Sequence, residues 1–227
     1  PNALKILEAA SADGLPDKFS YFAIARVRFG DQEVVVSRTG YTNELGWEFY
    51  TEPHHDADAL WAHIREAGKA YGLEIFGLDA MNIRRIEAGI LNAGADFNPA
   101  TKPYAAGLER FIDEDKGDFI GKAALALADR SVRSWGVKCP QGEPLISGEV
   151  RVQGRVAGTV TSGATSPFLG HGVGIVLMDS NTLAAGTRVE LRCKDGVLRP
   201  ADLVELPMYD TLGEIPRGKR VDIPERR

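Results

Sequence analysis

The stretch SRTGYTNELGWEFY, residues 37–50, is the most informative part of the sequence, because it joins strand-like segments through a loop. Gly40 and Gly46 allow the backbone to turn sharply near the two ends of that loop. Before it, the alternating segments YFAIARVRFG and EVVVSRTG are separated by Gly30 and Asp31, which predicts a β-hairpin. After the loop, WEFY predicts a further strand.

The loop places a carboxylate and aromatic rings within a few residues of each other, in Tyr41, Glu44 and Trp47. A carboxylate can accept two N–H donors from the edge of a flat heterocycle, while aromatic rings cover its faces. The alternative is a surface loop with a solvated Glu44 and with Trp47 packed on the core. Spacing alone favours this alternative, because loop carboxylates are usually solvated.

Helical patterns surround this loop in the first half of the chain. Apolar residues recur at helical spacing over residues 56–71 and again over residues 78–91. Shorter helices are predicted over residues 4–10 and after Gly121. The first half therefore combines a hairpin with several helices.

The second half has a different character. Residues 134–208 contain short β-type runs separated by Gly, Pro and Asn, which predicts a small β-barrel or sandwich. We therefore expect an α+β domain over residues 1–128 and a separate β domain over residues 129–227. The tail from Asp210 is rich in proline and charge and is expected to extend over the surface.

The segment GLDAMNIRRIEAG, residues 77–89, contains a second group of candidate residues. Arg84 and Arg85 are adjacent and point about 100° apart on a helix, so one could face a ligand or the interior while the other is solvated. Glu87 lies within helical pairing range of Arg84. On spacing alone, an ion pair on the helix surface is the favoured interpretation.

Histidines and cysteines do not suggest a metal site. His54 and His55 are adjacent at a predicted helix entry, and His171 stands alone in a glycine-rich stretch. Cys139 and Cys193 lie far apart, without a CxxC motif, which argues against a zinc site or a disulfide framework. Two free thiols fit a reducing compartment, so a cytoplasmic location is expected.

Composition and charge exclude some classes of protein. The chain has 227 residues, a formal net charge of −5 and a pI near 5.5. A nucleic-acid-binding protein would normally show a basic face. No apolar run reaches the roughly 20 residues that a membrane helix needs, and the first residues resemble an amphipathic helix more than a signal peptide. We therefore expect neither a nucleic-acid partner nor a membrane.

Several motifs together resemble one family. The stretch at residues 37–50 is similar to the aminomethyltransferase pattern S-R-T-G-Y-T-G-E-x-G-[FY]-E, with Asn43 in place of a glycine and Trp47 in the aromatic position. The resemblance continues through GLDAMNIRRIEAG, KPYAAGLERFIDEDKGDFIGKAAL and GTVTSGATSPFLGHGVGIVLM. It covers nearly all of residues 1–208 and points to the family of the glycine cleavage T-protein.

The resemblance implies a folate-binding aminomethyltransferase domain followed by a C-terminal β-barrel, with tetrahydrofolate as the cofactor. Glu44 matches the family glutamate that contacts the pterin, which favours a binding role for this residue over the solvated alternative. Tyr41 and Trp47 are then candidates to line the cofactor site, and Arg85 matches a later family arginine. These four residues form the predicted cofactor-binding set.

Two departures from the family pattern affect the expected chemistry. The family triplet A-R-D, whose arginine lies near the folate, is replaced by Ala80-Met81-Asn82. The family aspartate near the reacting carbon belongs to a region upstream of Pro1, so no catalytic residue is assigned. The N-terminal part of the folate domain is therefore expected to be incomplete.

The predicted function is tetrahydrofolate-dependent transfer of a one-carbon unit, aminomethyl or methyl. The donor would be a small amine or a methylated compound, with a lipoyl carrier protein as a candidate partner. One alternative is the folate module of a flavin-dependent dimethylglycine- or sarcosine-type dehydrogenase, which the terminal LPMYDTLGEIPRGKR resembles. Another is a non-catalytic folate-binding protein.

Overall fold

The computed structural model describes residues 2–220 and divides into two compact units. One unit contains the chain up to Met81 and the segment that begins at Asp210, and the other runs from Asn82 to Tyr209. Across the described residues, we find no helix with the length and apolar character needed to span a bilayer. The predicted domain boundary between residues 128 and 129 stays a prediction.

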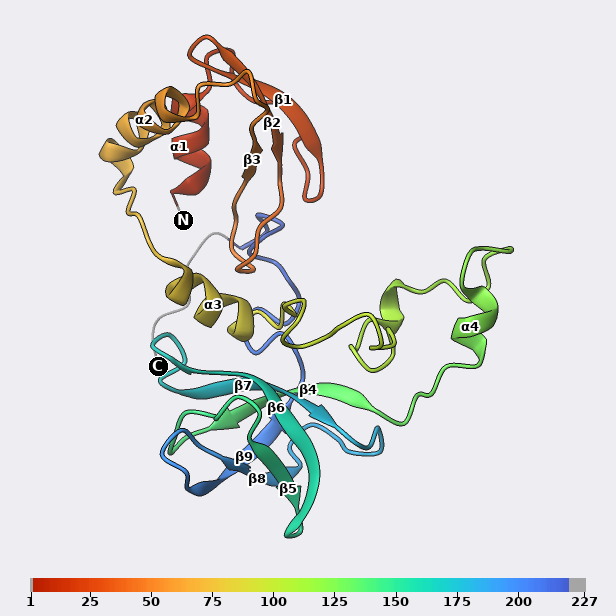
Figure 1. Ribbon diagram of the computed structural model, residues 1–227. Coiled ribbons are helices and arrows are strands. Elements are labelled where there is room, and N and C mark those ends of the chain that lie inside the picture. Colours follow the sequence, from red (N-terminus) through yellow and green to blue (C-terminus); the bar gives the residue numbers. More distant parts are fainter. Residues whose placement is uncertain (1, 221–227) are drawn as a thin grey trace. The chain divides into compact units, whose positions relative to one another are not determined.

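The first unit is built on a three-stranded antiparallel sheet in the order β1-β2-β3 (Figure 1). The strands are β1 (Ile24–Phe29), β2 (Gln32–Ser37) and β3 (Glu48–Tyr50). Phe29 pairs with Gln32, which leaves a two-residue turn at Gly30 and Asp31. The predicted hairpin is confirmed, and the predicted turn-rich loop from Gly40 to Gly46 lies between its second strand and β3.

Two helices supply the rest of the core of this unit: α1 (Ala3–Ala10) and α2 (Ala57–Gly68), with a short 3₁₀ turn, η1 (Lys69–Tyr71), after α2. Both helices bury apolar side chains with the strands, because their apolar residues recur on one face. The buried cluster contains Leu7, Ala10, Val27, Phe29, Val34, Val36 and Leu60.

The start of α2 provides a test of local structure. The Asp56 side chain accepts a hydrogen bond of 2.9 Å from the backbone N–H of Ala59, as an N-cap residue does. We expect Asp56→Ala to lower the free energy of unfolding by about 1 kcal/mol in urea titration. Asp56→Asn keeps an acceptor and should remain close to the parent protein. An equal loss in both variants would contradict the capping role.

The helix predicted over residues 78–91 ends earlier than expected. It is α3 (Leu78–Glu87), and the prediction of its end was wrong. Gly89 has a φ of +67°, and the backbone N–H of Ile90 donates to the carbonyl of Arg85 at 2.9 Å. This is the C-terminal capping pattern that a glycine in the left-handed region allows.

Between α3 and the barrel, regular structure is limited to η2 (Glu109–Phe111) and α4 (Lys122–Ala126), the latter being the helix expected after Gly121. The barrel that follows is closed and antiparallel, in the order β4-β7-β6-β5-β8-β9. Its strands are β4 (Arg133–Cys139), β5 (Glu149–Val152), β6 (Arg155–Ser166), β7 (His171–Met178), β8 (Arg188–Arg192) and β9 (Leu198–Val204).

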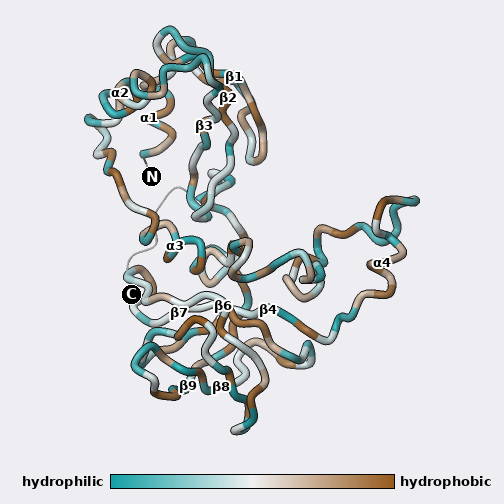
Figure 2. The backbone as a smooth tube through the Cα atoms, viewed as in Figure 1, coloured by the Kyte–Doolittle hydropathy of each residue, from teal (hydrophilic) through white to brown (hydrophobic). Residues whose placement is uncertain are grey.

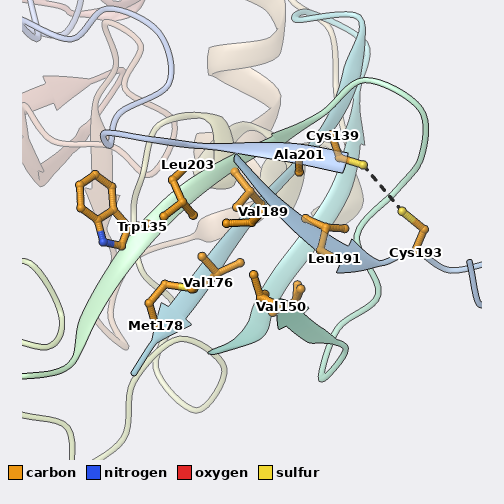
Figure 3. Close-up of a cluster of buried hydrophobic side chains, with 12 residues drawn as sticks. Trp135, Cys139, Val150, Val176, Met178, Val189, Leu191, Cys193, Ala201 and Leu203 are labelled. Carbon is orange, nitrogen blue, oxygen red and sulfur yellow. Dashed lines mark hydrogen bonds between the residues drawn. The ribbon is translucent and has the colours of Figure 1, made fainter. Parts of the chain in front are cut away.

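The barrel interior is the larger apolar core. In Figure 2, hydrophobic stretches recur along the barrel strands, and Figure 3 shows the side chains that they bury. Fully buried members include Val137, Val150, Val176, Leu191 and Leu203. The α+β portion followed by a β-barrel that the sequence predicted is confirmed.

Candidate functional site

The glycine-flanked loop between β2 and β3 is partly sheltered from solvent. Tyr41, Glu44 and Trp47 are all half-buried, whereas a freely solvated loop would expose them. Asn43 has a φ of +56°, in the left-handed region that Gly and Asn tolerate best. The replacement of the family glycine by asparagine at this position therefore preserves the turn.

The loop is tied to the segment that begins at Asp210, within the same compact unit. The Asn43 side-chain amide lies 3.4 Å from Asp210 Oδ2. Asp210 also accepts backbone N–H bonds from Glu214 at 3.0 Å and Ile215 at 2.9 Å. Ile215 is buried. This segment therefore supports the loop from a part of the chain about 170 residues later in sequence.

Arg38, at the start of the loop, carries a partly buried positive charge. Its guanidinium donates to the carbonyl oxygens of Phe19 at 2.6 Å and Pro216 at 3.4 Å. Burial lowers the pKa of Arg38. Within residues 2–220 its Nε is buried without a hydrogen-bond partner, and no carboxylate pairs with it. Arg38 therefore places a partly buried positive charge beside the loop.

Trp47 packs toward the core of the first unit. Its ring lies 6.5 Å from that of Phe19 and it packs against the buried cluster of α1, α2, β1 and β2. With Ile6, Phe49 and Leu73, it lines an apolar pocket of about 170 Å³. Its indole Nε1 is buried without a hydrogen-bond partner in the described part of the chain. Trp47 thus anchors one end of the loop in the core.

The structure adds a carboxylate that the sequence did not single out. Glu48, the first residue of β3, accepts a short hydrogen bond from the Thr39 hydroxyl, and the Tyr50 hydroxyl lies 3.4 Å away. Ser37 Oγ lies 3.3 Å from the Tyr50 hydroxyl. The alternation of side chains along a strand could have indicated that residues 48 and 50 share a face.

Arg85 lies at the centre of a buried polar network in the second unit. Its guanidinium forms an ion pair with Asp96 and donates to Ser162 Oγ at 2.8 Å and to Asn82 Oδ1 at 2.9 Å. Asp96 in turn accepts bonds of 2.6 Å from the hydroxyls of Ser162 and Thr161. Protein groups therefore take up most of the Arg85 donors. Arg85 belongs to a different compact unit from Tyr41, Glu44 and Trp47.

Arg84 is not solvated either. It forms an ion pair with Glu87, whose side chain is fully buried, and donates to the Tyr209 hydroxyl at 2.7 Å. Its guanidinium carbon lies 4.9 Å from the ring centre of Phe168 and 4.6 Å from that of Tyr209. The expected Arg84–Glu87 pair is confirmed, but its assignment to the helix surface was wrong. Ser166 also bonds to Glu87, which completes the pairing of the buried carboxylate.

The Arg85 network forms part of the wall of a cavity of about 530 Å³ in the second unit. The rest of the wall is half polar, from Asn82, Asn92, Ser147 and Thr159, and half apolar or glycine. This volume falls in the range of ligand sites in proteins. The cavity therefore has room for a hydrogen-bonding group. The positive charge of Arg85 in its wall is neutralised by Asp96.

The histidines make local contacts. The Nδ1 atom of His55 accepts the backbone N–H of Glu52 at 2.7 Å, which leaves Nε2 to donate to the Glu33 carbonyl at 2.8 Å. His171 Nδ1 lies 2.9 Å from the Gly172 carbonyl. The described residues include no cluster of three or more His, Cys, Asp or Glu side chains able to hold a metal ion.

Comparison with protein families matches both halves of the chain. Residues 1–116 match the model described as the GCVT N-terminal domain. Residues 133–210 match the glycine cleavage T-protein C-terminal barrel domain. The first match alone covers more than half of the chain.

Individual relatives agree with these models. The chain is 36% identical over 218 residues to an aminomethyltransferase of Caldanaerobacter subterraneus, covering 92% of this chain and 56% of the relative. It is also 36% identical over 218 residues to a trimethylamine-oxide aldolase of Ruegeria pomeroyi, covering 89% of this chain and 27% of that protein. The chain therefore spans about half, or less, of the length of these relatives.

A solved structure has the same fold. The crystal structure of the glycine cleavage system aminomethyltransferase T from Bartonella henselae matches with a TM-score of 0.79 at 24% identity. The match covers 92% of this chain and 58% of that structure.

Proposed function

Because this chain belongs to the glycine cleavage T-protein family, we propose that it binds tetrahydrofolate and takes part in one-carbon transfer from an amine or methylated donor. Bound tetrahydrofolate would supply the nitrogen that accepts the one-carbon unit. The contribution of the chain itself is to bind and orient the pterin. The half-buried Glu44 in its glycine-flanked loop is the observation that carries this proposal.

Glu44 has the chemistry to hold the edge of a pterin. The pterin edge presents an amino group and a ring N–H side by side, and a carboxylate accepts both at once. Because Glu44 is half-buried, water competes less for its oxygens than it would at the surface. Tyr41, three residues earlier, would cover a face of the ring.

The charge around the loop suits an anionic ligand. The protein as a whole is acidic, with a net charge of −5, but Arg38 lies beside the loop without a carboxylate partner in the described chain. The glutamate tail of a folate is negatively charged at neutral pH, so a local positive charge favours its approach.

The other two predicted residues, Trp47 and Arg85, have different surroundings. Trp47 would hold the loop in position through its contacts with the core of the first unit. Arg85 stays a predicted cofactor-binding residue, and Asp96 and Ser162 hold its guanidinium in the second unit. Glu48 is a second carboxylate in the first unit and is the main alternative to Glu44 as the residue that binds the pterin.

A binding measurement tests the assignment of Glu44. Isothermal titration of the full chain with tetrahydrofolate should show Glu44→Gln weakening the affinity by about 10- to 100-fold, because it loses a charge-assisted hydrogen bond. Glu52→Gln, at an exposed glutamate just beyond β3, is the matched control and should leave the affinity unchanged.

Glu48→Gln, measured in the same titration, distinguishes which of the two carboxylates binds the pterin. A loss of affinity in Glu44→Gln together with an unchanged Glu48→Gln supports the assignment. If only Glu48→Gln weakens binding, Glu44 is not the pterin ligand. No binding by the parent chain would contradict the proposed function itself.

A second candidate function rests on the aldolase relative. That protein is named for its action on trimethylamine oxide, and this chain corresponds to about a quarter of its length. A folate module of a longer demethylating enzyme would capture a carbon released elsewhere in the same protein. Transfer assays should therefore compare a methylated amine as donor with an aminomethyl group on a lipoyl carrier protein. The lipoyl partner and the cytoplasmic location both stay predictions.

A further inference from the structure

Two thiols lie in contact inside the barrel. The sulfur atoms of Cys139 and Cys193 are 3.7 Å apart, and both residues are free and buried (Figure 3). They are 54 positions apart in sequence, and their spacing argues against a zinc site or a disulfide framework. The tertiary structure therefore forms a dithiol that the sequence did not indicate.

The topology of the barrel explains this contact. Strand β9 lies between β4 and β8, and pairs with both of them. Cys139 ends β4, and Cys193 follows β8 at the turn into β9. The Cys139 sulfur lies 3.9 Å from the carbonyl oxygen of Pro200 on β9. Closure of the sheet thus brings both thiols to one end of the barrel.

The neighbouring turn holds Cys193 in place. A Cβ atom added to Gly142 would lie 2.7 Å from the sulfur of Cys193, so the backbone after β4 packs directly on this thiol. The backbone N–H of Cys193 also donates to the carbonyl of Val197 at 2.9 Å. The turn after β4 and the backbone of Cys193 therefore keep the Cys193 sulfur next to that of Cys139.

We propose that Cys139 and Cys193 form an oxidation site, at which a peroxide or a small disulfide converts the dithiol to a disulfide that ties β4 to the β8–β9 turn. With hydrogen peroxide, one sulfur attacks an oxygen and becomes a sulfenic acid as water is released. The second sulfur then displaces a second water molecule. The two thiols lose two electrons and two protons, and the peroxide is reduced to two water molecules. With a small disulfide, one thiolate breaks the S–S bond of the reagent to give a mixed disulfide and one free thiol, and the second thiolate then displaces the other half as a second free thiol.

The sulfur atoms need only a small movement to bond. A disulfide has an S–S length of about 2.05 Å, so the two sulfurs must approach by roughly 1.6 Å. A metal ion is a poorer explanation of the pair, because the described residues offer no third Cys, His, Asp or Glu at this place. The reaction with an oxidant is therefore the chemistry that the dithiol supports best.

Burial controls the rate of this reaction. Burial, followed by the contact with Cys193, raises the pKa of Cys139 to about 11. The reactive thiolate is therefore scarce at neutral pH, and its population rises about tenfold per pH unit up to that value. The exposed residues 194–197 adjoin the buried Cys193, so a small oxidant has its shortest route to the pair there.

Intact-mass spectrometry of the full chain tests the proposal. The chain is equilibrated with mixtures of reduced and oxidised glutathione at pH 8 and then alkylated with N-ethylmaleimide. We expect a monomer 2 Da lighter than the reduced chain, without alkyl groups, and a mapped peptide that joins Cys139 to Cys193. Dithiothreitol should restore two alkylation sites. Free thiols at all glutathione ratios, glutathione adducts or intermolecular dimers would each overturn the proposal.

Cysteine variants and thermal unfolding supply the control. Cys139→Ala and Cys193→Ala should each show no loss of 2 Da under the same conditions. If either variant folds poorly, the peptide map of the parent chain still shows whether Cys139 is joined to Cys193. The cross-link restricts the unfolded chain, so the melting temperature of the parent protein should rise by about 5 °C or more on oxidation. An unchanged melting temperature would contradict the cross-link between β4 and the turn.

Discussion

Replacing Asp96 by asparagine should lower the free energy of unfolding of the second unit by about 3–5 kcal/mol. Asparagine has nearly the same shape as aspartate, so the change removes the charge without opening a cavity. It leaves the Arg85 guanidinium buried, at 3% exposure, without a counter-charge. The hydroxyls of Ser162 and Thr161 also lose a charged acceptor. An uncompensated buried charge is among the most costly defects in a folded protein.

Urea titration followed by circular dichroism measures this loss. Asp202→Asn is the matched control, because it breaks the pair between Arg188 and Asp202 in the same barrel. The side chains of that pair are 66% and 37% exposed, so its removal should cost about 1 kcal/mol or less. Similar small losses in both variants would show that the Arg85–Asp96 pair does not stabilise the unit as its burial indicates.

Gly172→Ala is expected to be the second severe change, with a loss of about 3 kcal/mol or more. A Cβ atom at position 172 would lie 1.9 Å from the carbonyl oxygen of Gly142 and 2.9 Å from that of Cys139. Both neighbours are backbone atoms, which cannot rotate away as a side chain does. The turn after β4 would have to move, and with it the packing on Cys193.

Thermal unfolding of Gly172→Ala should therefore show a clear fall in melting temperature. Gly117→Ala is the control, because Gly117 is exposed and a Cβ atom there would meet no other atom within 4 Å. Its stability should stay within about 0.5 kcal/mol of the parent chain. A mild effect at Gly172 would show that the turn can shift without loss of barrel packing.

Local patterns in the sequence were sufficient for most of the elements. The turn at Gly30 and Asp31 separates two alternating segments, and β1 and β2 pair there. Asp56 precedes an apolar helical pattern and caps α2. These features depend on side-chain alternation, capping and glycine conformation, which act over a few residues and can be recognised in a single sequence.

The end of α3 shows where such patterns fail. Apolar residues continue to Leu91, yet the helix ends at Glu87. A Cβ atom on Gly89 would lie 2.6 Å from the side chain of Leu206, so this glycine is also required by a contact across more than 100 residues of sequence. No periodicity contains information about a neighbour so distant in the chain.

Motifs and local patterns were enough to identify the family, the hairpin and the barrel, and to select Glu44, Tyr41 and Trp47 as candidates for cofactor binding. Burial and pairing are properties of the folded chain: the loop is half-buried, Arg85 pairs with Asp96, and the two cysteines are in contact. They could not be predicted, because the cost of burying a charge and the chemistry of a thiol depend on which distant groups surround it. Those groups come together only when the chain has folded.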